Sequence, residues 1–506
     1  MLTNFFNGLA FVMQPESFFY MLFGVVEGVV IGALPGLSGS IGIILVLPLV
    51  YKMEADLAMV MLCGIFCGSM FGGSVSAILL NAPGTPAAAA TLLDGYPLSK
   101  RGEAGKAIGT AAISSFIGGL ISTLCLIFIS PQLSVVALQF HAADFFSLAI
   151  FGLSLIAASS GKNVGRGLLA GLFGALLGTF GTDPIMGSSR FTFGYHYLMN
   201  GFELLPVLIG IFAVSEVFAQ VGQKQESAYS NGSDVQRMLP TMSEMKKIFK
   251  VSGIGGVIGV LVGIVPGTGG SISCFLSYNL ARKMSKTPEE FGNGSLEGIA
   301  ACESSNNGTT GGALIPMLTL GVPGDVITSV MLGALVLIGV TPGPMLFVNN
   351  VDTVYSIFAG MFVIQFLMLA VGLIFARVAH HVLKVPNNLM MPMILVLCVA
   401  GTYSISNQIY HVVVAFLFGL VGLFMKKYQF PGAPLILGII LGPMAEQNLN
   451  RALQITKNDW SILFTRPISC TFLVVAVLSV ALQTYSTLKE RKLALAKAQE
   501  NKEEVS

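Results

Sequence analysis

Long continuous stretches without charge are the strongest constraint on what this chain can fold into. A membrane-spanning helix needs about 20 apolar residues. Charged residues make up 10% of the 506 residues, against about 25% in soluble domains. A chain with so few charged residues cannot form the charged surface of a soluble protein, and this composition excludes a soluble multidomain enzyme, a disordered chain and a disulfide scaffold. The stretches that contain no Asp, Glu, Lys or Arg are 57–93, 107–143, 251–281, 326–351, 353–376, 385–425 and 467–488.

The apolar runs are continuous, whereas the strands of a membrane β-barrel alternate apolar and polar residues over about 10 positions. The sequence therefore predicts an all-α, polytopic integral membrane protein with roughly 11–14 membrane elements. The estimate includes shorter apolar runs, which lie at 18–34, 145–160, 167–182, 203–219 and 428–445.

Basic residues are concentrated in two polar segments, 221–250 and 489–506. Because Lys and Arg near span ends favour the cytoplasm, we expect both segments inside the cell. The first 51 residues contain no Lys or Arg, so we expect the N-terminus on the periplasmic side. The predicted division is a first membrane repeat at 1–220, a cytoplasmic linker at 221–250, a second repeat at 251–460, a C-terminal span at 461–488 and a cytoplasmic tail at 489–506.

The two membrane repeats are predicted from an internal similarity. Four glycines spaced four residues apart, the last of them preceded by Pro, begin each half at a constant offset of 231 residues. The matched pairs include Gly24 and Gly255, Gly28 and Gly259, Gly32 and Gly263, Pro35 and Pro266, Gly36 and Gly267, and Ser40 and Ser271. A second Pro-Gly pair follows in each half, at Pro83-Gly84 and Pro323-Gly324, now at an offset of 240.

These patterns predict discontinuous helices. Glycine at every fourth position lets a neighbouring helix backbone approach closely. Proline then interrupts the helical hydrogen bonds, and the freed backbone groups must be buried in protein or line a cavity. Broken helices in paired positions are typical of transport sites at a repeat interface, although a single one can also be a plain kink. With the linker inside, the repeats are expected to be inverted.

The candidate binding residues lie at these breaks. Hydroxyl, amide and backbone oxygens suit a small cation such as Na⁺, and exposed helix N-termini suit a carboxylate. The substrate-binding candidates are Pro35, Gly36, Ser38, Gly39, Ser40, Asn81, Pro83, Gly84, Thr85, Pro266, Gly267, Thr268, Gly270, Ser271, Pro323 and Gly324. The coupling-cation candidates are Glu303, Ser305, Asn306, Asn307, Thr309, Thr310 and Asp325. Glu27 is a further carboxylate in an apolar stretch, with Ile258 at the matching position.

Motifs of other protein classes are missing. The chain contains no GxxxxGK[ST], HExxH or GxSxG, and we expect neither an enzyme nor a bound cofactor. A channel remains an alternative, although it would ordinarily show a ring of charge or a repeated filter. A structural scaffold gives no reason for four paired turns.

Four segments resemble the large membrane permease subunit of the tripartite tricarboxylate transporters. They are GALPGLSGSIGIILVLPLVYKM, NAPGTPAAAATLLDGYPLSKRGEAGKAIG, GIVPGTGGSIS and EGIAACESSNNGTTGGALIPMLTLGVPGD. The resemblance covers about residues 15–450. It implies a secondary transporter of the bacterial inner membrane that imports carboxylates such as citrate, driven by sodium or protons. It also implies two partners, a periplasmic solute-binding protein and a small membrane subunit of about four spans. An uncoupled, channel-type carboxylate permease is the alternative.

Overall fold

The computed structural model describes residues 1–158, 164–183, 187–220, 238–267, 269–383 and 387–503. The chain forms two compact units. Unit 1 comprises 1–138 and 205–423, and unit 2 comprises 139–204 and 424–506. Each unit therefore draws on both halves of the sequence. The division into sequence repeats is a separate matter and stays a prediction.

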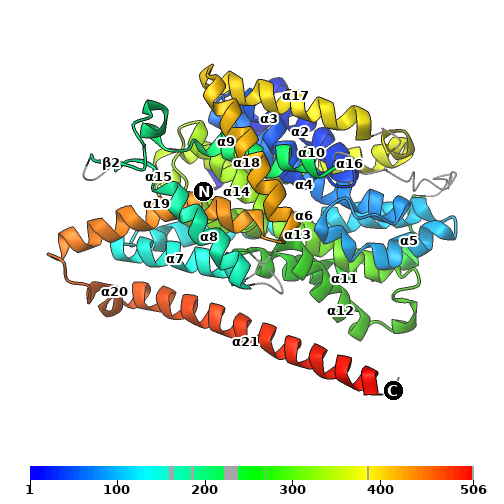
Figure 1. Cartoon of the computed structure of the whole chain (residues 1–506). Helices are drawn as coiled ribbons and strands as arrows, with labels where there is room; N and C mark the ends of the chain where they lie inside the picture. The colour runs from blue at the N-terminus through cyan, green and yellow to red at the C-terminus, as the bar shows by residue number, and fades with distance from the viewer. Residues whose placement is uncertain (159–163, 184–186, 221–237, 268, 384–386, 504–506) are drawn as a thin grey trace. The chain divides into compact units, whose positions relative to one another are not determined.

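Unit 1 is built from helices, several of them interrupted at Pro-Gly turns (Figure 1). In chain order they are α1 (Leu2–Val12), α2 (Pro15–Ala33), α3 (Gly39–Val50), α4 (Ala55–Leu80), η1 (Pro86–Ala89), α5 (Leu92–Lys100), α6 (Ala104–Ala137), α9 (Leu204–Leu208), η3 (Ile209–Val214), α10 (Ser215–Gln220), α11 (Met242–Gly263), α12 (Gly269–Met284), η4 (Pro288–Glu290), α13 (Leu296–Leu320), α14 (Val326–Leu337), α15 (Leu346–Asn349), α16 (Val351–Val382), α17 (Asn387–Ser406) and α18 (Ile409–Lys427).

Unit 2 contains the only strands in the described part of the chain. Its elements are α7 (Ala142–Ala158), α8 (Val164–Gly178), β1 (Gly181–Thr182), β2 (Ser189–Arg190), η2 (His196–Asn200), α19 (Gly432–Ile455), α20 (Ile462–Thr465) and α21 (Pro467–Glu503). The two strands pair antiparallel, with Gly181 opposite Arg190. Helix α19 packs on α7 and α8, and the first part of α21 packs along α7.

Six of the described helices are long and apolar enough to cross a membrane. They are Pro15–Ala33, Ala55–Leu80, Ala104–Ala137, Val351–Ala379, Ile409–Lys427 and Pro467–Tyr485, and several shorter apolar helices accompany them. The prediction of an all-α, polytopic membrane protein is therefore confirmed. Residues 221–237 of the predicted linker lie outside the described residues, and its residues 242–250 form the first part of α11.

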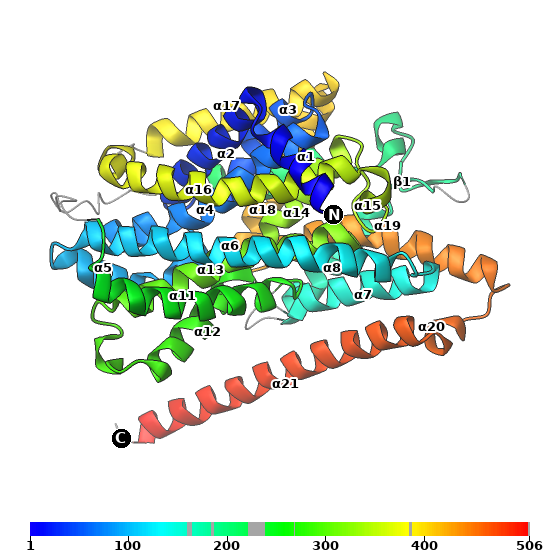
Figure 2. The same ribbon diagram turned by 180° about the vertical axis from the view of Figure 1, so that it is seen from behind.

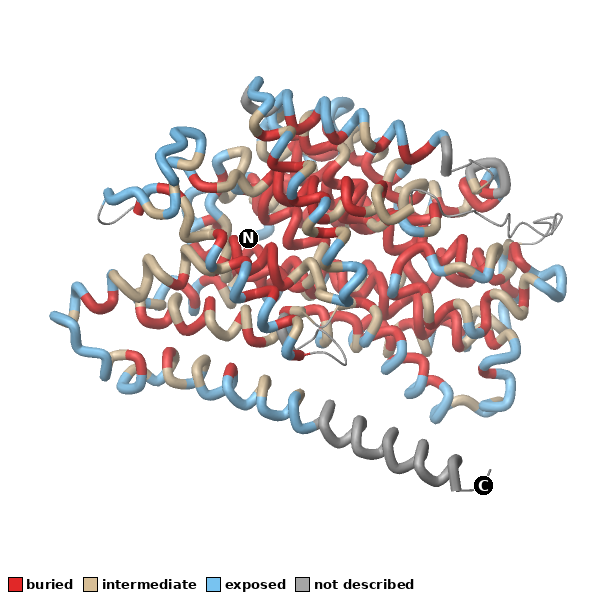
Figure 3. The backbone as a smooth tube through the Cα atoms, in the orientation of Figure 1, coloured by how far each residue is buried: buried red, intermediate tan, exposed pale blue. Residues whose placement is uncertain are grey.

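The core of unit 1 is formed by α4 and α13, which are buried along almost their whole length (Figure 3). Helices α6, α11 and α13 lie side by side in both views (Figures 1 and 2). Helix α6, from the first half of the sequence, packs along α13 of the second half, and α16 of the second half packs against α4 of the first. The two halves of the sequence are thus interleaved within one unit.

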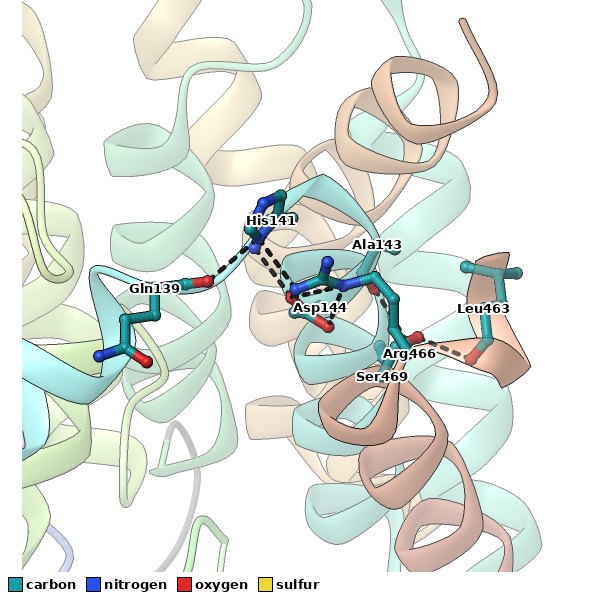
Figure 4. A network of polar contacts seen from close by, with 8 residues as sticks. Gln139, His141, Ala143, Asp144, Leu463, Arg466 and Ser469 are labelled. Atoms are coloured by element: carbon teal, nitrogen blue, oxygen red, sulfur yellow. Dashed lines mark hydrogen bonds and ion pairs between the residues drawn. The ribbon is translucent and has the colours of Figure 1, made fainter. Parts of the chain in front are cut away.

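An ion pair anchors the C-terminal helix within unit 2 (Figure 4). The fully buried carboxylate of Asp144, in the first turn of α7, accepts hydrogen bonds from Nε and Nη2 of Arg466, with Nη2 at 2.7 Å from Oδ2. The backbone N–H of His141 donates to the same oxygen, Oδ2 of Asp144. One helical turn along, the hydroxyls of Ser147 and Ser469 lie 2.6 Å apart. These contacts fix the start of α21 against α7.

Replacing Arg466 by Gln should loosen this attachment, because the substitution leaves the Asp144 carboxylate buried without its cationic partner. We expect the attachment of α21 to α7 to lose about 2–4 kcal/mol of stability. The segment 456–461 should then be cleaved faster by a protease, which is measured on the full-length protein in detergent. Arg451→Gln is the matched control, because Arg451 is exposed on α19. Equal cleavage rates for the two variants would contradict this role of Arg466.

Candidate functional site

The glycines singled out in the sequence lie at backbone contacts between paired helices. In the first half, Gly24, Gly28 and Gly32 of α2 face the carbonyl oxygens of Met61, Ile65 and Ser69 of α4. In the second half, Gly255, Gly259 and Gly263 of α11 face the carbonyl oxygens of Ala301, Ser305 and Thr309 of α13. Each contact in the first half has its counterpart in the second at the offsets found in the sequence.

The facing helices contribute glycines of their own. A Cβ atom on Gly68 of α4 would lie 2.6 Å from the carbonyl oxygen of Val25, and one on Gly308 of α13 would lie 2.7 Å from that of Gly256. Real Cβ atoms do not approach a backbone oxygen so closely. Only glycine therefore allows the two backbones of each pair to approach to this distance.

Each glycine helix ends at a turn with left-handed backbone. The φ angle is +87° at Gly36 and +81° at Gly267, which occupy equivalent positions. The helices α4 and α13 also end in left-handed residues at equivalent positions, Asn81 with φ of 57° and Gly321 with φ of 70°. Asn81 is exposed, and its backbone conformation ends α4. Asn tolerates the left-handed conformation better than most residues do.

The four Pro-Gly turns meet one another. We number them in chain order: the first turn (Pro35-Gly36), the second (Pro83-Gly84), the third (Pro266-Gly267) and the fourth (Pro323-Gly324). Within the first half, Gly84 packs on the carbonyl oxygen of Gly32, which precedes the first turn. Within the second half, the N–H of Gly267 donates to the carbonyl oxygen of Gly324 at 2.7 Å.

The turns also meet across the two halves. A Cβ atom on Gly39, after the first turn, would lie 2.9 Å from Cδ1 of Ile327, after the fourth. A Cβ atom on Gly270, after the third turn, would lie 3.2 Å from Cβ of Ala87, after the second. These two contacts are equivalent under the repeat offsets. The four turns therefore form a closed ring of contacts within unit 1.

Buried oxygen atoms without hydrogen-bond partners among the described residues lie beside this ring. They are Oδ1 of Asn306, which lies beside Gly270, and Oγ1 of Thr85, which follows the second turn; Oδ1 of Asn307, the next residue of α13, also has no partner in the described part of the chain. Both Asn side chains are fully buried, and their amide nitrogens donate to α4, Asn306 to the carbonyl of Met70 at 3.0 Å and Asn307 to that of Cys67 at 3.4 Å. A Cβ atom on Gly270 would lie 2.9 Å from Oδ1 of Asn306. A buried acceptor left unpaired is costly unless a ligand or water satisfies it.

The other coupling-cation candidates have protein partners. The carboxylate of Glu303 is fully buried and accepts hydrogen bonds from the hydroxyls of Thr91 and Ser115. The hydroxyl of Ser305 lies 2.6 Å from that of Ser273. The hydroxyls of Thr309 and Thr310 donate to helix carbonyls three residues earlier. The oxygen atoms of these side chains keep lone pairs that could bind a cation. Their positions, however, are fixed by hydrogen bonds within the protein.

Asp325 acts as the N-cap of α14. Its Oδ1 accepts hydrogen bonds from the backbone N–H and the hydroxyl of Thr328, both at 2.7 Å, and the Thr328 hydroxyl in turn accepts from the N–H of Asp325. The carboxylate thereby neutralises the positive end of the α14 dipole. The D-x-x-T pattern of a reciprocal cap was present in the sequence and could have indicated this contact.

The remaining candidates lie at the starts of α3 and α12. Ser38 precedes α3 and makes no capping hydrogen bond from its side chain; its hydroxyl lies 2.7 Å from that of Ser40. The N-terminus of α3 therefore remains free of a side-chain cap, in contrast to that of α14. Gly270 is buried and Ser271 is half-buried in the first turn of α12, and Thr268 lies outside the described residues.

Several residues near the site were not singled out from the sequence. Gln220 lies beside Gly36, where its Nε2 would be 2.5 Å from an added Cβ, and donates to Glu216 at 2.7 Å. Gln365 of α16 is fully buried, donates to the carbonyl of Met361, and leaves Oε1 without a partner among the described residues. A single amide in the uncharged stretch 353–376 was the available signal for Gln365.

One family model and two relatives from a single organism match this chain. The sequence model of the tripartite tricarboxylate transporter TctA family matches residues 18–437. A 52.8 kDa protein from the TAR-I ttuC' 3' region of Agrobacterium vitis is 32% identical over 495 residues, which cover 97% of this chain and 98% of that protein. A protein from the TAR-II ttuC' 3' region of the same organism is 32% identical over 234 residues, covering 46% of this chain and 97% of that protein. No solved structure matches the chain.

The backbone contacts of the glycines lead to a prediction within α11. Gly259→Ala should destabilise the protein by about 1–3 kcal/mol, because the added Cβ would lie 2.8 Å from Cα of Gly308. Gly253→Ala is the matched control on the same helix, since no atom lies within 4 Å of its added Cβ. Thermal unfolding of both variants in detergent checks the difference. A Gly259→Ala variant as stable as Gly253→Ala would contradict the packing described here.

Proposed function

Because this chain belongs to the tripartite tricarboxylate transporter TctA family, we propose that it is the large permease subunit of a system that imports organic carboxylates. In this proposal the substrates are di- or tricarboxylates such as citrate, and a sodium or proton gradient drives uptake across the bacterial inner membrane. A periplasmic solute-binding protein delivers the substrate, and a small membrane subunit of about four spans completes the complex. The linker and the tail face the cytoplasm, and the N-terminus faces the periplasm.

The observation that carries the proposal is the ring of four turns with unpaired buried oxygens beside it. Broken helices in a membrane protein place polar backbone groups where lipid cannot satisfy them, so these groups need a polar ligand, water or protein. The ring has two features that suit a carboxylate and its coupling cation, a helix N-terminus without a side-chain cap and neutral oxygen ligands. Neither is needed for a purely structural kink.

We place the carboxylate at the start of α3. The first N–H groups of a helix have no intrahelical partner, and they carry partial positive charge. Ser38 and Ser40 add two hydroxyl groups at this point. The start of α14 is less suitable for an anion because the Asp325 carboxylate already occupies it. Helix α12 begins at the position equivalent to α3 and is the second choice.

We place the coupling cation at Oδ1 of Asn306, with Thr309 as a second oxygen ligand. An oxygen ligand set of amide and hydroxyl groups is typical for a hard cation. None of the side chains named at the ring is basic. A carboxylate in this low-dielectric position therefore gains from a cation bound nearby, and the cation gains from the carboxylate. A half-loaded site keeps an uncompensated charge, which disfavours its movement across the membrane.

Asn306→Ala tests the cation site. Removing one oxygen ligand should raise the half-saturating concentration of the driving cation by about tenfold or more. The half-saturating concentration of the carboxylate should rise with it, because the two ligands stabilise each other. Uptake into proteoliposomes at varied cation and substrate concentrations measures both effects.

Asn279→Ala is the matched control, since Asn279 is exposed on α12. If Asn306→Ala and Asn279→Ala have the same half-saturating concentrations of cation and of carboxylate, Asn306 does not bind the cation. A rise in the carboxylate constant alone would assign Asn306 to the substrate instead.

Reconstituted uptake tests the mechanism as a whole. The binding protein, whose ligand is first identified by melting it with a panel of carboxylates, is added to proteoliposomes that contain both membrane subunits. We expect accumulation above the external concentration when an inward sodium or proton gradient is imposed, and none without a gradient. Uptake that only equilibrates, whatever the gradient, would favour the channel-type permease.

A further inference from the structure

The start of α11 and the end of α12 enclose a groove of about 290 Å³ on unit 1, away from the four turns. Lys246, Lys247 and Lys250 of α11 line one side, and Lys286 follows α12 on the other. One acidic residue, Glu297, also lines the groove, and its carboxylate accepts a hydrogen bond from the hydroxyl of Ser285. Among the described residues, no carboxylate forms an ion pair with any of the four lysines. The groove therefore carries an excess of positive charge.

The rest of the groove is apolar. Its lining includes Val251 and Ile254 of α11, and Ala281 and Met284 of α12. The apolar surface continues along both helices, away from the lysines. On α11 the side chains of Val257 and Leu261 are 49% and 63% exposed, and on α12 those of Leu276 and Leu280 are also exposed.

The groove has lysines at one end and an apolar surface beyond them, as a membrane lipid has a charged headgroup and apolar acyl chains. In a multi-pass membrane protein the exposed apolar side chains face acyl chains, and lysines at helix ends lie at the level of the lipid headgroups. A soluble phosphate would be attracted to the lysines but has no apolar part to cover Ile254 and Met284. A zwitterionic lipid would cover the apolar residues but leave the lysine charge uncompensated.

We propose that this groove binds one anionic phospholipid, with its phosphodiester headgroup among Lys246, Lys250 and Lys286 and its acyl chains along α11 and α12. The same two helices are joined by the third turn, Pro266-Gly267. A lipid between them braces the arms of this turn against each other. The proposal rests on the membrane location of the chain and not on its transport activity.

The experiment uses the delipidated full-length protein and native mass spectrometry with added phosphatidylglycerol. We expect one phosphatidylglycerol molecule to remain bound at a collision energy that removes phosphatidylcholine. The triple variant Lys246→Gln, Lys250→Gln, Lys286→Gln should bind phosphatidylglycerol at least about tenfold more weakly, because each basic residue near the surface contributes to anionic lipid binding. Thermal unfolding without lipid establishes that the variant is folded.

The matched control replaces Lys52, Lys100 and Lys283 by Gln, because these lysines are exposed on the same unit but do not line the groove. This variant should retain phosphatidylglycerol with unchanged affinity. Equal losses in the two triple variants would overturn the proposal, as would equal retention of phosphatidylcholine. Stabilisation by inorganic phosphate alone, to the extent seen with phosphatidylglycerol, would identify a phosphate site rather than a lipid site.

Discussion

The close approach of helix backbones at the glycine contacts is the constraint on which the rest of unit 1 depends. Glycine removes the side chains that keep helices about 8–10 Å apart, so α2 lies directly on α4, and α11 on α13. This packing fixes where each glycine helix ends relative to its partner. Gly84 can then rest on Gly32, and Gly324 lies at the equivalent place beside Gly263. The turns meet because the helices that precede them are in direct backbone contact with their partners.

The scaffold repeats, but the chemistry at the ring does not. The positions equivalent to Asn306 and Asn307 are Phe66 and Cys67, which offer no oxygen from their side chains. Thr85 has Asp325 as its counterpart, and the added carboxylate serves to cap α14. The backbone contacts of the two halves are therefore equivalent, but the side chains beside them differ. In the proposed mechanism this asymmetry provides one cation site, beside the third turn, rather than a pair.

The sequence predicted the membrane helices and the four breaks, because uncharged runs, glycine spacing and Pro-Gly pairs are local signals. It did not predict which turns meet across the halves, since the contact of Gly39 with Ile327 joins residues far apart in the chain. Nor did it reveal the pairing of Asp144 with Arg466, which lie 322 residues apart in the chain. Asp325 is among the predicted cation ligands because it follows a Pro-Gly turn, whereas in the structure its carboxylate caps α14. The binding roles of the candidates stay predictions.

The described residues of the ring include no basic side chain, which bears on how a carboxylate could be carried. A fixed Arg or Lys would bind the anion strongly, but it would leave an uncompensated positive charge whenever the site was empty. Helix N–H groups carry only partial charge, and amide oxygens carry none, so these ligands leave no full positive charge behind in the empty ring. In the proposed mechanism the bound cation then cancels one negative charge of the substrate. Cation binding thereby lowers the net charge that the loaded site carries along a low-dielectric path, and with it the cost of crossing.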